Sequence, residues 1–106
     1  MGERLQPLLA ELRGRLQALY GPRLLRLMLY GSQARGDAEP GSDIDVLVVL
    51  AGSVRPGEEI RRTGDTTAAI SLENNVVISC AFISGERFER EESPLMINVR
   101  REGVLL

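Results

Sequence analysis

The residue types that the sequence lacks exclude several classes of reaction. All thirteen of its basic residues are arginines, because it contains no lysine and no histidine, and it has one cysteine and no tryptophan. Schiff-base chemistry, Ser-His and Cys-His nucleophilic pairs, the usual zinc sites and Walker-type phosphate binding all need residues that are missing here. Carboxylates, arginines, hydroxyls and backbone amides remain, and this set suits the chemistry of magnesium and phosphate.

Long apolar segments and an excess of basic charge are missing as well. No stretch approaches the ~18 continuous apolar residues that span a bilayer, and the charged N-terminal segment lacks the apolar block of a signal peptide. The single cysteine, Cys80, cannot form an internal disulfide, which agrees with a reducing compartment. We therefore expect a cytoplasmic protein with no membrane partner. With a net charge of −2 and a sequence pI near 5.2, it is not expected to have a strong nucleic-acid surface.

Alternating helical and strand-like segments predict a single α/β domain over residues 1–106, with a mixed sheet of three or four strands and helices packed against it. Helices are predicted at residues 3–19, 33–36 (one short turn), 56–64, from Ser84 onward, and from Pro94 to just before Gly103. Strands are predicted at residues 23–30, 43–50 and 76–83.

Three finer expectations concern packing and charge. A leucine stripe is expected to bury one face of the first helix: Leu5, Leu8, Leu9, Leu12, Leu16 and Leu19. Ion pairs at i,i+4 spacing are expected at three places: Glu11–Arg15, Glu58–Arg62 and Glu86–Arg90. The apolar tail at residues 104–106 is expected to fray, and the alternative is that it forms an interface. Assembly of the chain into a homo-oligomer is left open.

The most informative motif joins the first two strands. The first strand ends at Gly31-Ser32, and ten residues later come Asp43 and Asp45, at the start of the next strand. Because side chains alternate along a strand, both aspartates point to one face, with Cα atoms about 6.5–7 Å apart. Two carboxylates at that separation can converge on magnesium, and side-by-side like charges are destabilising without a cation. We therefore predict that Asp43 and Asp45 are catalytic metal ligands.

The residues after the first strand complete a phosphate-binding half of the site. Gly31 lets the backbone come close to phosphate oxygens, and Ser32 adds a hydroxyl and an amide donor. Arg35 stands one helical turn later, where a guanidinium can contact a β- or γ-phosphate. The alternative for Arg35 alone is a solvated side chain on a short helix. Together these residues predict a site for a magnesium–nucleoside triphosphate.

The pattern resembles the GSx10DxD signature of the polymerase-beta-type nucleotidyltransferase superfamily, and the short length resembles its minimal nucleotidyltransferases. The resemblance implies a mixed sheet, Mg2+ as cofactor and transfer of a nucleoside monophosphate, usually AMP from ATP, to a hydroxyl. It also implies a toxin–antitoxin setting, in which the partner is a helical HEPN-type protein whose tyrosine is modified. Within the family's motif, Gly31 and Ser32 correspond to the phosphate-binding turn, and Asp43 and Asp45 to the metal ligands.

One part of the family's pattern is missing. Active members usually place a third carboxylate on the next strand, but residues 76–83 contain no acid, and Ser79 occupies the expected position. A neutral serine is a poor magnesium ligand and no base at neutral pH. Glu73 is a possible but poorly placed substitute, with a loop carboxylate as the alternative. Cys80 is expected to be a core residue.

Three functions therefore compete. The first is an active nucleotidyltransferase that modifies a partner protein, because the 106 residues leave little room to present an acceptor. The second is a catalytically weak or inactive member that binds nucleotide and neutralises a partner by complex formation. The third is a transferase for polynucleotides or small molecules, which the expected absence of a basic surface and of a second domain disfavours.

Overall fold

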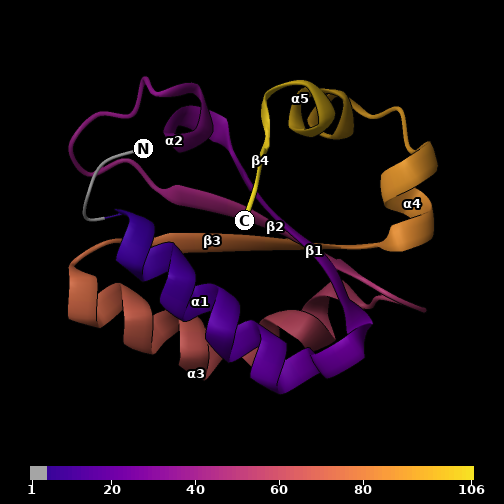
Figure 1. Ribbon diagram of the computed structural model, residues 1–106, viewed down its shortest axis with the longest axis horizontal. Coiled ribbons are helices and arrows are strands. Elements are labelled where there is room, and N and C mark those ends of the chain that lie inside the picture. The colour runs from indigo at the N-terminus through magenta and orange to yellow at the C-terminus, as the bar shows by residue number, and fades with distance from the viewer. Residues whose placement is uncertain (1–4) are drawn as a thin grey trace.

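The computed structural model describes residues 5–106, and its helices and strands follow the predicted alternation (Figure 1). In chain order the elements are α1 (Leu5–Tyr20), the 3-10 turn η1 (Gly21–Arg23), β1 (Leu24–Tyr30), α2 (Gly31–Arg35), β2 (Ile44–Leu50), α3 (Pro56–Asn74), β3 (Ile78–Ser84), α4 (Gly85–Arg90), α5 (Pro94–Glu102) and β4 (Val104–Leu105).

The four strands form one mixed sheet in the order β3-β2-β1-β4. β1 is antiparallel to both β2 and β4, whereas β2 and β3 are parallel and are joined by α3. The expected mixed sheet of three or four strands is therefore confirmed, and its fourth strand, β4, lies in a segment that was not predicted to be a strand. Residues 1–4 lie outside the description, so the predicted start of the first helix at residue 3 is not tested.

Each face of the sheet has its own core, and β2 contributes to both. α1 and α3 cover one face, and α2, α4 and α5 lie over the other (Figure 1). The first core contains the buried residues Leu5, Leu8, Leu9, Leu12, Leu16, Tyr20, Leu27, Leu29, Ile44, Val46, Val48, Leu50, Ile70, Ile78 and Phe82. The second is smaller and contains Met28, Leu47, Val49, Ile83, Phe88, Met96 and Val99. This double burial explains why residues 46–50 read as a continuous apolar run.

The leucine stripe of α1 is confirmed except at its end. Leu19 is 43% exposed, and Tyr20 is buried in its place. Tyr20 continues the i,i+4 spacing that runs through Leu12 and Leu16, so the buried face of a regular helix passes through it. The helix then ends at Gly21-Pro22, as the sequence predicted.

Helix α3 is about twice as long as predicted and continues to Asn74 instead of ending near Gly64. Its polar sequence hides the pattern, because few of its side chains are buried: Glu59, Thr63 and Ile70. The threonine hydroxyls on its inner side bond back to the helix: Thr63 Oγ1 donates to the Glu59 carbonyl at 2.8 Å. Such bonds satisfy hydroxyl groups inside the fold without another polar partner.

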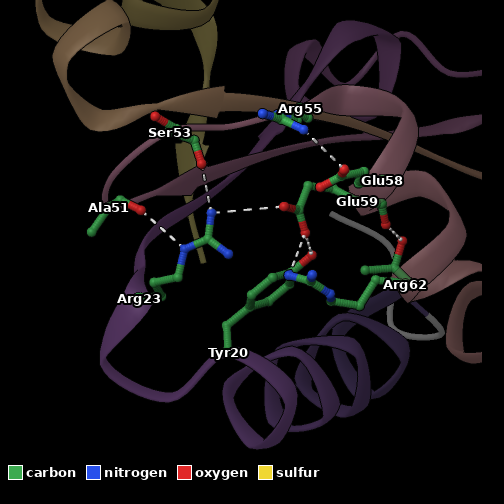
Figure 2. Close-up of polar contacts among 9 residues, drawn as sticks. Tyr20, Arg23, Ala51, Ser53, Arg55, Glu58, Glu59 and Arg62 are labelled. Atoms are coloured by element: carbon green, nitrogen blue, oxygen red, sulfur yellow. Dashed lines mark hydrogen bonds and ion pairs between the residues drawn. The ribbon is translucent and has the colours of Figure 1, made fainter.

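A buried carboxylate connects α3 to α1 and η1 (Figure 2). Glu59 is only 2% exposed, and its Oε1 accepts from the Tyr20 hydroxyl at 2.6 Å and from Arg62 at 3.1 Å. Arg23 lies 3.7 Å from the other carboxylate oxygen and also donates to the carbonyls of Ala51 and Ser53. The buried charge is therefore paired and hydrogen-bonded, as such a group requires.

Two of the three expected ion pairs are confirmed: Glu11–Arg15 and Glu86–Arg90. The pair expected between Glu58 and Arg62 is wrong, because Arg62 turns to the buried Glu59 and Glu58 contacts Arg55. The buried carboxylate offers Arg62 a stronger electrostatic attraction than an exposed one does.

The C-terminal tail does not fray. Val104 and Leu105 pair with Leu29 and Met28 of β1, and the Leu106 amide donates to the Leu27 carbonyl at 2.8 Å. Unsatisfied backbone groups of β1 are the reason, because the tail gives them partners. No helix within residues 5–106 combines the length and apolar character needed to cross a membrane.

Candidate active site

The junction between β1 and α2 brings backbone and carboxylate together. Tyr30 ends β1 with extended backbone, and Gly31 begins α2 with a φ of 72°. A β-carbon at Gly31 would lie 2.5 Å from Oδ2 of Asp45, so any larger residue would have to displace the Asp45 carboxylate. Ser32 is half-buried in the first turn of α2. The predicted Gly31-Ser32 turn is thus packed directly against the predicted metal ligand.

The loop from α2 to β2 is held by its own hydrogen bonds. The amides of Gly36 and Asp37 both donate to the Ser32 carbonyl, at 3.0 and 3.1 Å. Farther along, Glu39 and Ser42 bond twice: the Ser42 amide donates to the Glu39 carbonyl, and the Glu39 amide donates to the Ser42 hydroxyl. These bonds fix the chain immediately before Asp43, the predicted metal ligand, and such a ligand must be well placed.

Asp43 and Asp45 lie at the start of β2. Asp43 is exposed just before the strand, Asp45 is half-buried within it, and the buried Ile44 between them faces the α1–α3 core. Burial raises the pKa of the Asp45 carboxyl, the charge of Asp43 raises it further, and Arg35 lowers it. The surroundings therefore disfavour the ionised form of Asp45, and a cation bound at this position would stabilise it.

Arg35 is at the exposed end of α2, and its guanidinium contacts two acids. Its Nε donates to Asp37 at 3.2 Å, and a terminal nitrogen lies 3.6 Å from a carboxylate oxygen of Glu102 on α5. The hydrogen bond to Asp37 is the main cause that raises the pKa of Arg35. Sequence reasoning missed Glu102, because nothing in the spacing connects the last turn of α5 with a residue 67 positions earlier.

Three strands contribute side chains to the row that contains Asp45. The register pairs Asp45 with Tyr30 on β1 and with Ser79 on β3, so all three point to the face covered by α4 and α5. Ser79 is therefore beside Asp45, where the resemblance implies a third carboxylate. Burial and then the charge of Asp45 raise the pKa of the Tyr30 hydroxyl.

Glu73 and Cys80 belong to the opposite side of the sheet. Glu73 lies in the last turn of α3 and lines a cleft of about 680 Å³ together with Ile44 and Leu8, which belong to the α1–α3 core. It is therefore separated from Asp45 by the sheet and does not replace the third carboxylate. Cys80 packs against the same core, and burial raises the pKa of its thiol to about 11. Its expected role as a core residue is confirmed.

The donor set fits magnesium held jointly with a triphosphate. Within residues 5–106, no three His, Cys, Asp or Glu side chains come close enough together to hold a metal ion. Magnesium, however, is usually bound by one or two carboxylates together with substrate phosphates and water, not by a cage of protein ligands. Asp43 and Asp45 would supply the carboxylates, and the amides after Gly31 would meet the phosphates.

A small mixed sheet with two aspartates at the start of one strand, next to a glycine turn, defines the class of nucleotide-transferring domains. The family model described as "Nucleotidyltransferase domain" matches residues 9–95. The chain therefore belongs to the nucleotidyltransferase domain family. A comparison with curated proteins finds no match.

Solved structures agree with this family. A protein assigned as a minimal nucleotidyltransferase is 28% identical, with a TM-score of 0.53 over 92% of this chain and 95% of that one. A toxin–antitoxin complex with AMP-PNP is 17% identical, with a TM-score of 0.61 over 88% of this chain and 68% of that one. A complex of the tri-AMPylated Shewanella oneidensis HEPN toxin with its MNT antitoxin is 15% identical, with a TM-score of 0.52 over 92% and 70%. The last two are similar in fold.

Proposed function

We propose that this domain binds a magnesium–nucleoside triphosphate and transfers the nucleoside monophosphate to a hydroxyl on a partner protein. ATP as donor, AMP as the transferred group and a cytoplasmic setting are parts of the proposal. The observation that carries it is the packing of Gly31 against Asp45, with Asp43 beside it, at one end of the sheet. Neither acid has a structural partner that would explain the arrangement otherwise among the hydrogen bonds of residues 5–106.

The proposed reaction assigns a task to each group. The Gly31-Ser32 turn and Arg35 hold the triphosphate, and bound magnesium would neutralise charge on the phosphates. The acceptor oxygen attacks the α-phosphorus, the bond to the β-phosphate oxygen breaks, and pyrophosphate leaves. The acceptor proton must go to water or to a base, and Ser79 is not such a base at neutral pH. The residues of this chain thus favour binding and orientation over activation of the acceptor.

We propose a HEPN-type protein as the partner. The support is the similarity in fold to toxin–antitoxin complexes, one of which contains an AMPylated toxin. The site is also open: Asp43 and Arg35 are exposed, and no lid covers them within the described residues. A partner therefore has access to the place where its hydroxyl would meet the α-phosphate.

The test is transfer of label from α-labelled ATP to a HEPN-type protein of the same organism, with magnesium present. We expect label on that partner, and none with Asp43→Asn or Asp45→Asn, provided that both variants remain folded. Label that persists in both variants would contradict the proposed roles. If magnesium–ATP leaves the melting temperature of the pure protein unchanged, the nucleotide site itself is refuted.

The second candidate is a binding module without transfer, and the position of Ser79 beside Asp45 favours it. In that case the pure domain binds magnesium–ATP and forms a complex with its partner, but no label is transferred. Ser79→Asp separates the two candidates, because it places a third carboxylate in the row. A binding module that lacks only this group should gain transfer activity, whereas Ser79→Asn, which is similar in size but neutral, should gain none.

A further inference from the structure

Strand β3 is an edge strand that carries no charge, proline or bulge to discourage pairing. The strand order places it at one side of the sheet. Its sequence, ISCAFIS, contains no charge and no proline, and its seven residues pair with β2 without a shift in register. Exposed edges in natural proteins usually carry lysine, proline or a bulge, because a free row of backbone groups can pair with another chain.

The hydrogen bonds identify which backbone groups of β3 point outward. The Ile44 amide donates to the Val77 carbonyl at 2.8 Å, so Val77 and every second residue after it face β2. The backbone groups of Cys80 and Phe82 therefore point away from the sheet. At Ile78 the Ser71 hydroxyl accepts the outward amide at 3.3 Å. Within residues 5–106, no hydrogen bond involves the outward groups of Cys80 and Phe82.

The opposite edge is protected. There β4 covers Met28 and Leu29, and the Leu106 amide covers Leu27. The uncovered start of β1 contains a shift in register between Leu24 and Arg26, together with the charge of Arg26 itself. A bulge and an arginine both discourage pairing. The two edges thus differ, and only β3 is suited to accept another strand.

An exposed apolar side chain lies at the same edge. Val77, directly before β3, is 56% exposed. Its burial would add apolar area to the backbone bonds of a pairing.

We propose that β3 pairs with β3 of a second copy, antiparallel and about a two-fold axis at Ala81. This register sets Cys80 opposite Phe82 of the copy, and each of these two pairs exchanges two hydrogen bonds. The Ile78 carbonyl, whose amide is occupied by Ser71, can accept from Ser84 of the copy. The edge is therefore self-complementary, as an isologous interface must be, and its lack of charge brings no like charges together.

The dimer has a sheet of eight strands, in which Asp45 is one strand away from the interface and Ser79 lies on the interface strand itself. A short strand pairing buries less area than the ~1,200–2,000 Å² of a standard stable interface. We therefore expect a weak dimer, with a dissociation constant on the order of micromolar.

The first test measures mass against concentration by sedimentation for the wild type and for Cys80→Pro. We expect the wild type to change from 11.7 kDa to twice that mass across the micromolar range. Proline at position 80 removes only an outward amide, which an edge strand tolerates, and it should leave a folded monomer. Cys80→Ser keeps the amide and should dimerise like the wild type. Wild-type monomer at all concentrations would overturn the proposal.

The second test checks the register and does not depend on how well the proline variant folds. In a Cys80→Ser background, Ala81→Cys places two thiols opposite each other on the two-fold axis, in a pair without hydrogen bonds, at a Cβ separation near that of a disulfide. We expect rapid disulfide-linked dimer under mild oxidation. Val77→Cys in the same background should react slowly, because the register sets it opposite Gly85 of the copy. Equal cross-linking at both positions would refute this register.

Discussion

Gly31 and Asp45 approach so closely that a β-carbon on Gly31 would stand 2.5 Å from the carboxylate oxygen Oδ2 of Asp45. Real β-carbons essentially never come this near to an atom of a residue that is not their chain neighbour, and the backbone of Gly31 also has a φ of 72°, which non-glycine residues rarely adopt. Two independent constraints thus fall on one residue. The proposed phosphate-binding turn and the proposed metal ligand thus lie directly against each other.

Gly31→Ala should therefore lower stability and displace Asp45. We expect a loss of about 1–2 kcal/mol from the left-handed backbone, a further loss from the contact, and at least tenfold weaker magnesium–ATP binding. The control is Gly36→Ala, which also has a positive φ of 81° but no atom within 4 Å of its β-carbon. Denaturant unfolding and calorimetric titration compare the two. Equal losses of nucleotide affinity would mean that the Asp45 contact is unimportant.

The pH dependence of stability should show that the ionised carboxylate of Asp45 is unfavourable in the folded chain without metal. Its pKa is raised in the folded chain, so it favours the folded state below its unfolded pKa of about 3.9 and loses this contribution as the pH rises through the folded value. At pH 7 without metal, Asp45→Asn should be more stable than the wild type, by up to about 1 kcal/mol. The difference should vanish below pH 4 and reverse with saturating magnesium–ATP. Marked unfolding of the variant would make Asp45 structural.

Arg35 must exchange its carboxylate partners for phosphate if it binds the nucleotide. Glu102→Gln removes the partner on α5, and because an exposed ion pair is worth at most about 1 kcal/mol, magnesium–ATP affinity should rise two- to fivefold. In an Arg35→Gln background the same change should have no effect beyond a small gain from lost repulsion. Isothermal titration of magnesium–ATP into the wild type, the two single variants and the double variant completes the double-mutant cycle. Equal gains in both backgrounds would assign the effect of Glu102 to charge alone.

The fold could be predicted where local pattern and tertiary burial agree. The leucine stripe of α1, the double-sided apolar run of β2 and the caps at Ser84 and Ser93 all depend on residues within one turn or one strand. The length of α3 could not be predicted, because its inner face is lined by threonines and a buried glutamate. These become inner-face residues only when Tyr20 and Arg23 are brought to Glu59 from another part of the chain.

The candidate site likewise contains some residues that could be predicted from the sequence and some that could not. Gly31, Ser32, Asp43 and Asp45 follow from one local motif, and the strand register then places Ser79 beside Asp45. The pairing of Arg35 with Glu102 and the side of the sheet taken by Glu73 depend on how helices cross the sheet. That geometry is set by packing between distant segments, so the sequence left Glu73 open and gave no sign of Glu102.

The cluster around Glu59 should affect stability without affecting the candidate site. It contacts the chain after the C-terminal end of β2, at Ala51 and Ser53, whereas Asp45 lies at the start of that strand. Tyr20→Phe removes the 2.6 Å hydroxyl donor of Glu59, while Arg62 still donates to the same oxygen. The loss of a hydrogen bond to a charged group costs about 1.5–3 kcal/mol. We expect a lower denaturant midpoint with an unchanged slope.

The matching variant is Glu59→Gln, which keeps an acceptor for Tyr20 but removes the charge that Arg23 and Arg62 approach. Since both arginines are partly exposed, water can solvate them, and the loss should be smaller than with Glu59→Ala, which also leaves the Tyr20 hydroxyl unpaired. Magnesium–ATP affinity measured well below each midpoint should equal that of the wild type. A drop in affinity would instead mean that the cluster positions the site through one of two strands. These are β2, which ends just before Ala51, and β1, which begins just after Arg23 and ends beside Asp45.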